Sequence, residues 1–306
     1  MTFDDQASAE PIARLSQVSL CYGEVMAIKQ LNLDIHRGQV VALLGPNGAG
    51  KTSLVNLLLG LQSPSMGKAQ LLGQTPGELS CRQRIGVMMQ QAELADMLTV
   101  DELLQQFAGY YPAPLPHGHL LKLAGLEALS DRRYGKLSGG EKRRVQFAIA
   151  MAGNPEVLFL DEPTTGLDIE ARRQLWNSIR AFAGAGRSVL LTTHYLEEAD
   201  ELADRIVVMR SGECVADGAP SMIKQQINLR QVRCRSNADL MHLSTHPGVR
   251  EFHHQQQRLQ VLTTQAESLV AALLQTDPAL TELEVHGAGL EQAFIALTSD
   301  QPREAA

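Results

Sequence analysis

The residues whose types and spacing most clearly predict chemistry form a glycine-rich run that fits the pattern G-x-x-x-x-G-K-[ST]. The run reads Gly45-Pro46-Asn47-Gly48-Ala49-Gly50-Lys51-Thr52, with Ser53 next along the chain. Its glycines allow positive backbone dihedrals, so N–H groups can turn inward around phosphates, and a helix that starts near Lys51 adds its positive end. We expect Lys51 to reach the β and γ phosphates and the Thr52 hydroxyl to bind Mg²⁺. The run therefore predicts a site for a nucleoside triphosphate, with Ser53 included among its binding residues.

Two acidic residues follow a short apolar run farther along the chain. Residues 157–160 are Val, Leu, Phe and Leu, and Asp161 and Glu162 come directly after them. Such a run is typical of a strand that is buried on both faces of a parallel sheet, and these sheets bind ligands at the carboxyl ends of their strands. We expect Asp161 to bind Mg²⁺ through its outer shell and Glu162 to orient or deprotonate an attacking water.

A third motif has the sequence Leu-Ser-Gly-Gly-Glu at positions 137–141. Ser138 and Glu141 have the spacing of a capping box, and the helix expected after them would point its N-terminus at an anion. A capped helix alone would explain this motif if it stood in isolation. Together with the glycine-rich run and the acidic pair, it resembles the signature of the ATP-binding cassette ATPases, and the resemblance covers roughly residues 12–227.

The resemblance implies that the site is shared between two copies of the chain. In this family the L-S-G-G-x segment binds the γ phosphate of a nucleotide that the opposite subunit holds. Ser138, Gly139 and Gly140 are therefore expected to contact ATP on a second copy. Asp168, at the end of the sequence Thr-Gly-Leu-Asp, matches the loop that crosses this dimer interface.

Further positions match catalytic and adenine-binding residues of the family. Gln90 matches the glutamine that touches Mg²⁺ and the water, and its neighbour Gln91 is a rival for that role. His194 follows the apolar strand pattern at 188–191 and matches the switch histidine that contacts the γ phosphate. The resemblance also implies that Tyr22 stacks on adenine; an aromatic residue near a strand end is more often part of the core, but Gly23 favours exposure here.

The fold class expected from these patterns is α/β: a P-loop NTPase core with an antiparallel β subdomain, a helical subdomain and a small C-terminal α+β appendage. Strands are expected at residues 13–22, 30–36 and 39–44. The helical subdomain should span about residues 91–154, with a capping box at Thr99 and Glu102 and an interruption at the proline-rich segment 111–116. We expect a flexible tail at 1–11, the cassette domain at 12–227 and an accessory domain at 228–306.

The accessory domain has an alternating pattern of its own. Short strands are expected near 232–235, 249–252, 259–262 and 283–285, and helices at 266–275 and 290–297. The last helix resembles the terminal segment of cassettes that serve drug, antibiotic and ion exporters. No catalytic cluster is visible in this domain, so dimer support, regulation and a purely stabilising cap all fit it.

Composition and charge narrow the range of partners. The chain has 306 residues and a formal net charge of −7, so it has no general attraction for phosphate backbones and no nucleic-acid partner is expected. The basic groups Arg132-Arg133, Lys142-Arg143-Arg144 and Arg172-Arg173 are expected to be solvated helix faces. No C-x-x-C spacing occurs among the four cysteines, and no apolar stretch is long enough for a membrane span, so any transport must use another chain.

These features together predict an ATP-hydrolysing subunit that uses ATP and Mg²⁺ and forms a homodimer around two ATP molecules. It would power export through a separate integral-membrane permease, from a peripheral position on the cytoplasmic face of the membrane. A soluble cassette protein that acts on nucleic acid or ribosomes is one alternative, and an importer ATPase is another. Tandem cassettes, a long coiled coil or zinc modules would favour the first alternative, and none is visible.

Overall fold

The computed structural model describes residues 10–90, 92–225, 229–287 and 289–298. The chain divides into two compact units that meet between Asp217 and Gly218. We call residues up to Asp217 the cassette unit and those from Gly218 the C-terminal unit. Ile227, where the sequence places the end of the cassette domain, lies outside the described residues, and the limits 12–227 and 228–306 stay a prediction.

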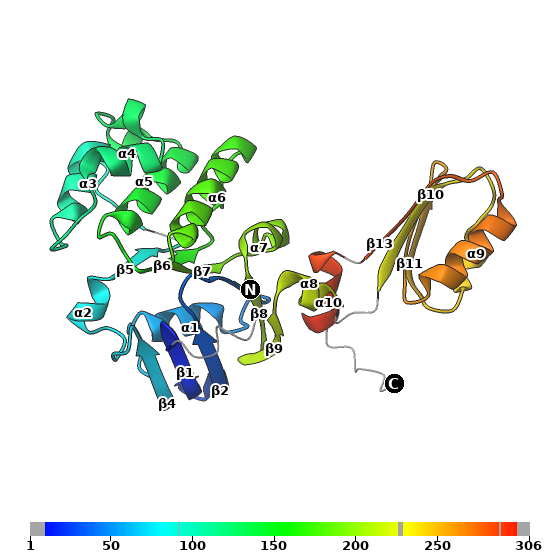
Figure 1. Ribbon diagram of the computed structural model, residues 1–306, viewed down its shortest axis with the longest axis horizontal. Helices are drawn as coiled ribbons and strands as arrows, with labels where there is room; N and C mark the ends of the chain where they lie inside the picture. Colours follow the sequence, from blue (N-terminus) through cyan, green and yellow to red (C-terminus); the bar gives the residue numbers. More distant parts are fainter. Residues whose placement is uncertain (1–9, 91, 226–228, 288, 299–306) are drawn as a thin grey trace. The chain divides into compact units, whose positions relative to one another are not determined.

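A six-stranded sheet forms the centre of the cassette unit (Figure 1). Its strands follow the order β5 (Ile85–Met88), β6 (Val157–Asp161), β7 (Ser188–Thr192), β3 (Val40–Leu44), β8 (Arg205–Arg210) and β9 (Glu213–Gly218). From β5 to β8 every neighbouring pair is parallel, and β3 and β7 are buried along their whole length. The sequence prediction of a parallel core with strands buried on both faces is confirmed.

The parallel register brings the ends of four strands to one edge of this sheet. Asp161 at the end of β6 lies beside Thr192 at the end of β7, and Leu43 of β3 lies on the other side of Thr192. Met88 of β5 lies beside Leu160. The loops that begin after these strands, at residues 45, 89, 162 and 193, are therefore neighbours in space although they are far apart in the sequence.

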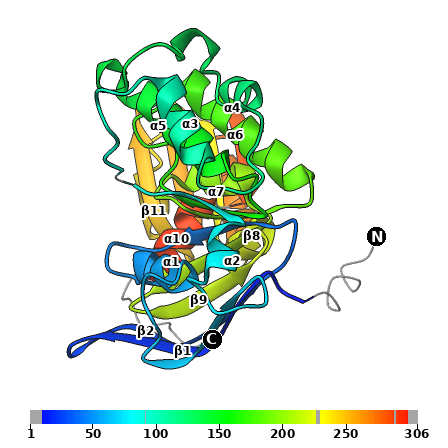
Figure 2. The same cartoon turned by 90° about the vertical axis from the view of Figure 1, so that its left-hand side faces the viewer.

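One side of α1 (Lys51–Leu58) faces the central sheet, and a three-stranded antiparallel sheet packs on its other side. The strand order of this second sheet is β2 (Val25–Ile35), β1 (Ala13–Tyr22) and β4 (Met66–Leu71). Figure 1 shows α1 between this sheet and the central one, and Figure 2 shows β1 and β2 at the end of the cassette unit away from α3 and α5. Apolar residues of β1, β2, α1 and the central strands form one buried cluster. The expected strand at 30–36 begins earlier, at Val25, because the pairing with β1 continues past Gln30, whose positive φ of 43° breaks the alternation of buried side chains.

Helices cover the other face of the central sheet, next to β5, β6 and β7 (Figure 1). They are α5 (Gly139–Met151) and α6 (Ile169–Gly184), and α3 (Val100–Ala108) and α4 (His117–Leu123) pack against α5. The short helix α2 (Leu79–Arg82) precedes β5, and α7 (Leu196–Leu202) follows β7. The capping box predicted at Thr99 and Glu102 begins α3, and residues 111–116 separate α3 from α4 as expected. None of the described helices is long and apolar enough to cross a membrane.

The C-terminal unit contains a four-stranded sheet with the order β11 (Val249–Gln255), β12 (Arg258–Thr263), β10 (Arg230–Arg235) and β13 (Thr281–Gly287), and all neighbours are antiparallel. This order is that of a split β-α-β fold, in which a 3-10 helix at Met241–Thr245 makes the first crossover and α9 (Ala266–Thr276) the second. Leu269 and Leu273 of α9 are fully buried against the sheet. Two further helices, α8 (Pro220–Gln225) and α10 (Leu290–Thr298), contact each other, which confirms the predicted α+β class.

Strand β5 approaches helix α5 closely at Gly86. A Cβ on Gly86 would lie 2.0 Å from the Ala150 carbonyl oxygen and 2.6 Å from a Leu158 methyl group, so Gly86→Ala should lower the free energy of unfolding by about 1–3 kcal/mol. The single tryptophan, Trp176, lies in the cassette unit, so its fluorescence during denaturant unfolding measures the effect. At Gly184, where an added Cβ meets nothing within 4 Å, the same change should leave stability unchanged or slightly raised. Equal effects at the two positions would contradict this packing of β5 on α5.

Candidate functional site

The glycine-rich run forms the loop between β3 and α1, as the sequence predicts. A Cβ on Gly45 would lie 2.5 Å from the Met209 carbonyl oxygen, and one on Gly50 would lie 2.6 Å from the Ala27 carbonyl oxygen. Gly50 has a φ of 102°, which favours glycine. Pro46, Asn47, Gly48 and Ala49 complete the loop, and Thr52 and Ser53 follow Lys51 in the first turn of α1. The loop therefore needs glycine both for its backbone conformation and for its packing against β2 and β8.

The start of α1 suits an anion. No side chain caps this helix and its first turn contains no acidic residue. The helices α3, α5 and α6 are different, because Thr99, Ser138 and Asp168 accept hydrogen bonds from their first-turn N–H groups. Since uncapped N–H groups at a helix N-terminus are good phosphate donors, α1 fits the phosphates of a nucleotide.

The side chain of Lys51 folds back onto the start of this loop. Its ammonium group donates to the Gly45 carbonyl at 2.6 Å and to the Pro46 carbonyl at 3.0 Å. Burial lowers the pKa of Lys51, and the charges of Glu162 and Asp161 oppose that shift. The lysine charge therefore lies close to both carboxylates at the edge of the sheet, as a phosphate-binding lysine beside a cation site requires.

Glu162 is the centre of the second part of the site. Its backbone has a φ of 48°, in the left-handed region, and its N–H donates to the Thr192 carbonyl at 3.0 Å. The side-chain amide of Gln90 donates to Glu162 Oε2 at 2.9 Å, and His194 Nδ1 lies 3.2 Å from Glu162 Oε1. The structure thus brings together Gln90, Glu162 and His194, the residues that the sequence predicts as catalytic. Gln91, the rival of Gln90, lies outside the described residues.

The donors expected for Mg²⁺ are all oxygens. Asp161 accepts a hydrogen bond from the Thr192 hydroxyl through one carboxylate oxygen. The amide nitrogen of Gln90 is engaged by Glu162, which leaves its amide oxygen for another partner. Thr52 is exposed beside Lys51. Hydroxyl, amide and carboxylate oxygens are the ligands that Mg²⁺ prefers, and it commonly completes its shell with waters and phosphates, so these residues fit the ion.

The remaining predicted residues form a separate cluster or lie apart. Ser138 begins α5 with a capping box, and a Cβ on Gly140 would lie 3.3 Å from the Leu167 side chain, so Ser138, Gly139 and Gly140 are next to the loop that ends at Asp168. Within the described part of the chain, no hydrogen bond or ion pair joins this cluster to the glycine-rich loop. Tyr22 is 44% exposed at the end of β1, and no contact of the described residues places it on that loop.

Arg143 is a residue at the site that the sequence prediction missed. The prediction that Arg143 lies on a solvated helix face is wrong, because only 7% of this residue is exposed. Its guanidinium donates to the Met89 carbonyl at 3.0 Å and to the Glu162 carbonyl at 2.9 Å. The spacing of apolar residues along the helix could have predicted this burial. Arg143 shares a helix face with Phe147 and Met151, four and eight residues later, and both are buried.

Glu198 is a buried acid whose carboxyl interacts with Thr193, the residue before His194. It is fully buried on α7 and accepts a hydrogen bond from the Trp176 indole at 3.0 Å. Burial raises the pKa of Glu198, and the polar groups of Thr193, Trp176 and Thr164 oppose the shift without cancelling it. The acid therefore links α6, α7 and the loop after β7. Its ionised form is less stable in this buried place than its protonated form.

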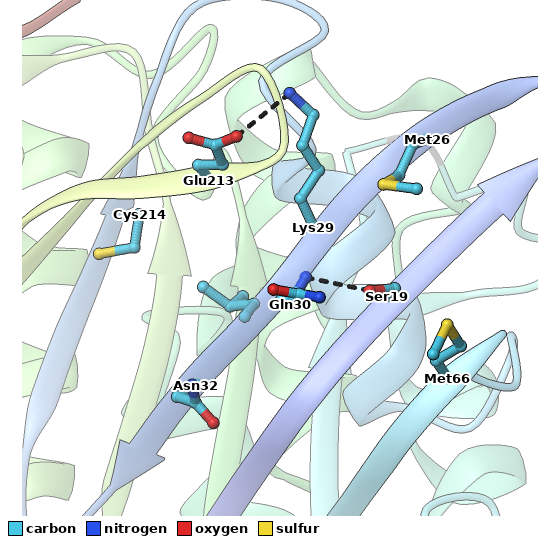
Figure 3. A pocket seen from close by; sticks show the side chains of 9 residues that line it. Ser19, Met26, Lys29, Gln30, Asn32, Met66, Glu213 and Cys214 are labelled. Carbon is cyan, nitrogen blue, oxygen red and sulfur yellow. Dashed lines mark hydrogen bonds and ion pairs between the residues drawn. The ribbon is translucent and has the colours of Figure 1, made fainter.

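A groove of about 640 Å³ lies elsewhere on the cassette unit and is lined by residues of β1, β2, β4 and β9 (Figure 3). Lys29 and Glu213 form an ion pair of 3.3 Å across it, and the Gln30 N–H donates to the Ser19 hydroxyl at 3.0 Å. None of the predicted site residues lines this groove. Its charged groups satisfy each other, so we assign no chemistry to it.

Comparison with known proteins shows a consistent set of likenesses. Residues 28–165 match the family model described as ABC transporter. The chain is 37% identical over 311 residues to a Nod factor export ATP-binding protein I of Ralstonia nicotianae, with 96% of each chain covered. It is also 37% identical over 295 residues to the protein of the same name from Neorhizobium galegae, with 93% of this chain and 84% of the relative covered.

Solved structures show the same fold. The ATP binding subunit of an ABC transporter is similar with a TM-score of 0.65 and 26% identity, over 70% of this chain and 92% of that chain. A dimeric ATP-binding cassette in a post-hydrolysis state, bound to ADP and phosphate, is similar with a TM-score of 0.61 and 26% identity, over 68% and 98% of the two chains. The α/β fold class predicted from the sequence is thereby confirmed.

The buried Glu198 predicts a pH dependence of stability. The unfolded chain ionises this carboxyl near its ordinary pKa of 4.5, whereas the folded chain holds its proton to higher pH. The folded state therefore binds more protons above pH 4.5, and the free energy of unfolding falls as pH rises through the raised pKa, by at most about 1.4 kcal/mol per pH unit. Glu198→Gln should remove this dependence.

Denaturant unfolding followed by Trp176 fluorescence, at several values between about pH 5 and about pH 8, measures the difference between variant and wild type. The variant should gain relative stability as pH rises. Glu197→Gln, on the exposed face of the same helix, is the control and should show no such trend. Parallel curves for wild type and Glu198→Gln would contradict the assignment.

Proposed function

This chain belongs to the ATP-binding cassette transporter family and is an ATPase subunit of its export branch, and from that premise we propose that two copies clamp ATP between them to drive export through a separate membrane protein. The observation that supports the proposal most is the convergence of Gln90 and His194 on Glu162, beside the charge of Lys51. A carboxylate held by an amide and an imidazole at the end of a phosphate-binding loop suits the activation of water against a terminal phosphate.

Each residue of this group has a distinct task in the proposal. The N–H groups of the loop and of α1, with Lys51, bind the phosphates and offset their charge. Glu162 orients the attacking water and accepts its proton, while His194 contacts the γ phosphate. Thr52, Asp161 and Gln90 would hold Mg²⁺, which neutralises charge on the phosphate oxygens when it is bound.

The second cluster gives the reason for a dimer. Ser138, Gly139 and Gly140 lie at the positive end of α5, but they are not joined to the loop of their own chain in the described residues. An anion that meets this helix start would come from a second copy, whose ATP is held by its own Lys51. Asp168 caps α6 next to this cluster and would lie at the interface. Tyr22, exposed at the end of β1, would contact adenine.

Transport needs a membrane-spanning partner. The cassette unit exposes large apolar side chains at Leu79 on α2, Met97 before α3 and Tyr110 after α3, each at least 65% exposed. Leu79 and Met97 flank β5 and Gln90 in the sequence, and exposed apolar side chains of this kind suit a docking surface for a permease. We therefore place the protein at the cytoplasmic face of the membrane, held there by its partner, and take the cargo to be selected by that partner.

The catalytic assignment is tested by ATP hydrolysis with the purified protein. Lys51→Ala should lower hydrolysis by at least about 100-fold, because it removes the cation at the phosphates. Glu162→Gln should lower kcat by about 100-fold or more while ATP still binds, because only the proton acceptor is lost. Lys29→Ala removes an exposed ion pair in the groove of Figure 3 and should leave activity unchanged. Activity near that of wild type in either site variant would contradict the roles of Lys51 and Glu162.

The dimer is tested by a change that keeps the cap of α5 but alters its charge. Aspartate is as good an N-cap as serine, so Ser138→Asp should preserve the helix start and place a negative charge against the partner's phosphate. In a Glu162→Gln background with ATP, it should weaken dimerisation by at least about 100-fold, since like charges at an interface cost several kcal/mol. Mass determination by light scattering measures this. Thr99→Asp, at the matching capping box of α3, is the control and should leave the dimer intact.

A further inference from the structure

A buried arginine joins the backbones of the two loops that contain Gln90 and Glu162. Arg143 lies on α5, and one terminal nitrogen of its guanidinium donates to the Met89 carbonyl and to the Gln146 side chain, each at 3.0 Å. The other terminal nitrogen donates to the Glu162 carbonyl at 2.9 Å. Met89 is the residue before Gln90, so one planar group holds the backbones on which both catalytic side chains are mounted.

The contacts form a closed ring. Arg143 bonds to the backbone before Gln90 and to the backbone of Glu162, and the side chains of Gln90 and Glu162 bond to each other at 2.9 Å. A flexible ammonium group could not hold two carbonyls at a fixed spacing in the same way, because only the guanidinium presents its donors in a rigid fork. The spacing of the two loops is therefore set by the shape of this side chain.

The surroundings of Arg143 support a positioning role. Burial lowers its pKa, while the charges of Asp161, Glu162 and Tyr134 act in the opposite direction. Gln146, which accepts from Arg143, donates to the Tyr134 hydroxyl at 3.1 Å, and Tyr134 is itself 3% exposed. Every bond of the guanidinium that the structure shows thus ends on a catalytic loop or on the part-buried side chain of Gln146, which lies on the same helix.

We propose that Arg143 is a positioning residue for ATP hydrolysis, which fixes the distance between Gln90 and Glu162 within its own chain by bridging the carbonyls of Met89 and Glu162. The inference rests on the proposed role of Glu162. It makes a specific claim about location: Arg143 acts on the active site of the chain to which it belongs. Ser138, at the start of the same helix, acts on the active site of the partner.

This difference allows a test with mixed dimers of two differently tagged chains, one of which carries Glu162→Gln. Hydrolysis in such a dimer comes from the chain that keeps Glu162. Arg143→Lys is then placed either in that chain or in the Glu162→Gln chain. In the first placement kcat should fall by about 10- to 100-fold with the KM for ATP within about twofold, because misplaced catalytic groups cost rate more than binding. In the second placement both constants should stay within about twofold.

The two placements separate positioning from a general defect of α5. If Arg143→Lys merely disturbed the helix, Ser138 would be displaced too, and the second placement would lose activity as well. Equal losses in both placements, or no loss in the first, would overturn the proposal. Arg143→Gln, which can donate to only one of the carbonyls, provides a second variant with the same expected outcomes if the lysine chain does not form dimers.

Two controls complete the design. Arg144→Lys changes the neighbouring arginine, which donates to the Gly125 carbonyl from an exposed position, and it should leave kcat unchanged in both placements. Dimers in which both chains carry Glu162→Gln should be inactive. If those dimers hydrolyse ATP at the rate of wild type, it is the proposed function of Glu162 that fails, and the result is distinguishable from failure of the Arg143 proposal.

Discussion

The catalytic end of the cassette unit depends on one turn, which Glu162 makes directly after the last residue of β6, Asp161. The left-handed backbone of Glu162 costs about 1–3 kcal/mol, so the surrounding structure must hold it in place. The Thr192 carbonyl accepts its N–H, and Arg143 donates to its carbonyl. Because both backbone groups are fixed, the carboxylate points to where Gln90 and His194 reach it. The parallel register supplies the rest, since it brings the loops after β3, β5, β6 and β7 to the same edge of the sheet.

A single rule for helix starts supports the proposal that two chains share each ATP. The first-turn N–H groups of a helix need an acceptor, which is either a side chain or a ligand. Thr99 and Asp168 satisfy α3 and α6 internally, while α1 has no side-chain cap and suits a phosphate. The start of α5 has a capping box like that of α3, in which Ser138 accepts from one N–H group, but a cap on one N–H group leaves the positive end of the helix able to attract an anion. Two copies of the chain can satisfy both demands at once.

The sequence predicted those features that depend on local signals. Apolar runs located β3, β6 and β7, the spacing of Thr99 and Glu102 located a capping box, and the glycine-rich motif located the phosphate loop. Contacts between distant segments could not be read in this way. The burial of Arg143 and Glu198 depends on which faces of α5 and α7 pack against the rest of the unit. In the sequence each residue stands in a cluster of charged residues, and such clusters predict exposed side chains instead. The early start of β2 was missed because the positive φ of Gln30 interrupts the alternation that identifies a strand.

In the proposed dimer, ATP is bound by the loop of one chain and the serine-led helix of another. The most direct measurement is an experimental structure of the Glu162→Gln chain with ATP and Mg²⁺. We expect a dimer in which each γ phosphate lies near Lys51 of one chain and within hydrogen-bond distance, about 3 Å, of the Ser138 hydroxyl of the partner subunit. A nucleotide held entirely by one chain, with Ser138 of both copies exposed to solvent, would contradict the proposal.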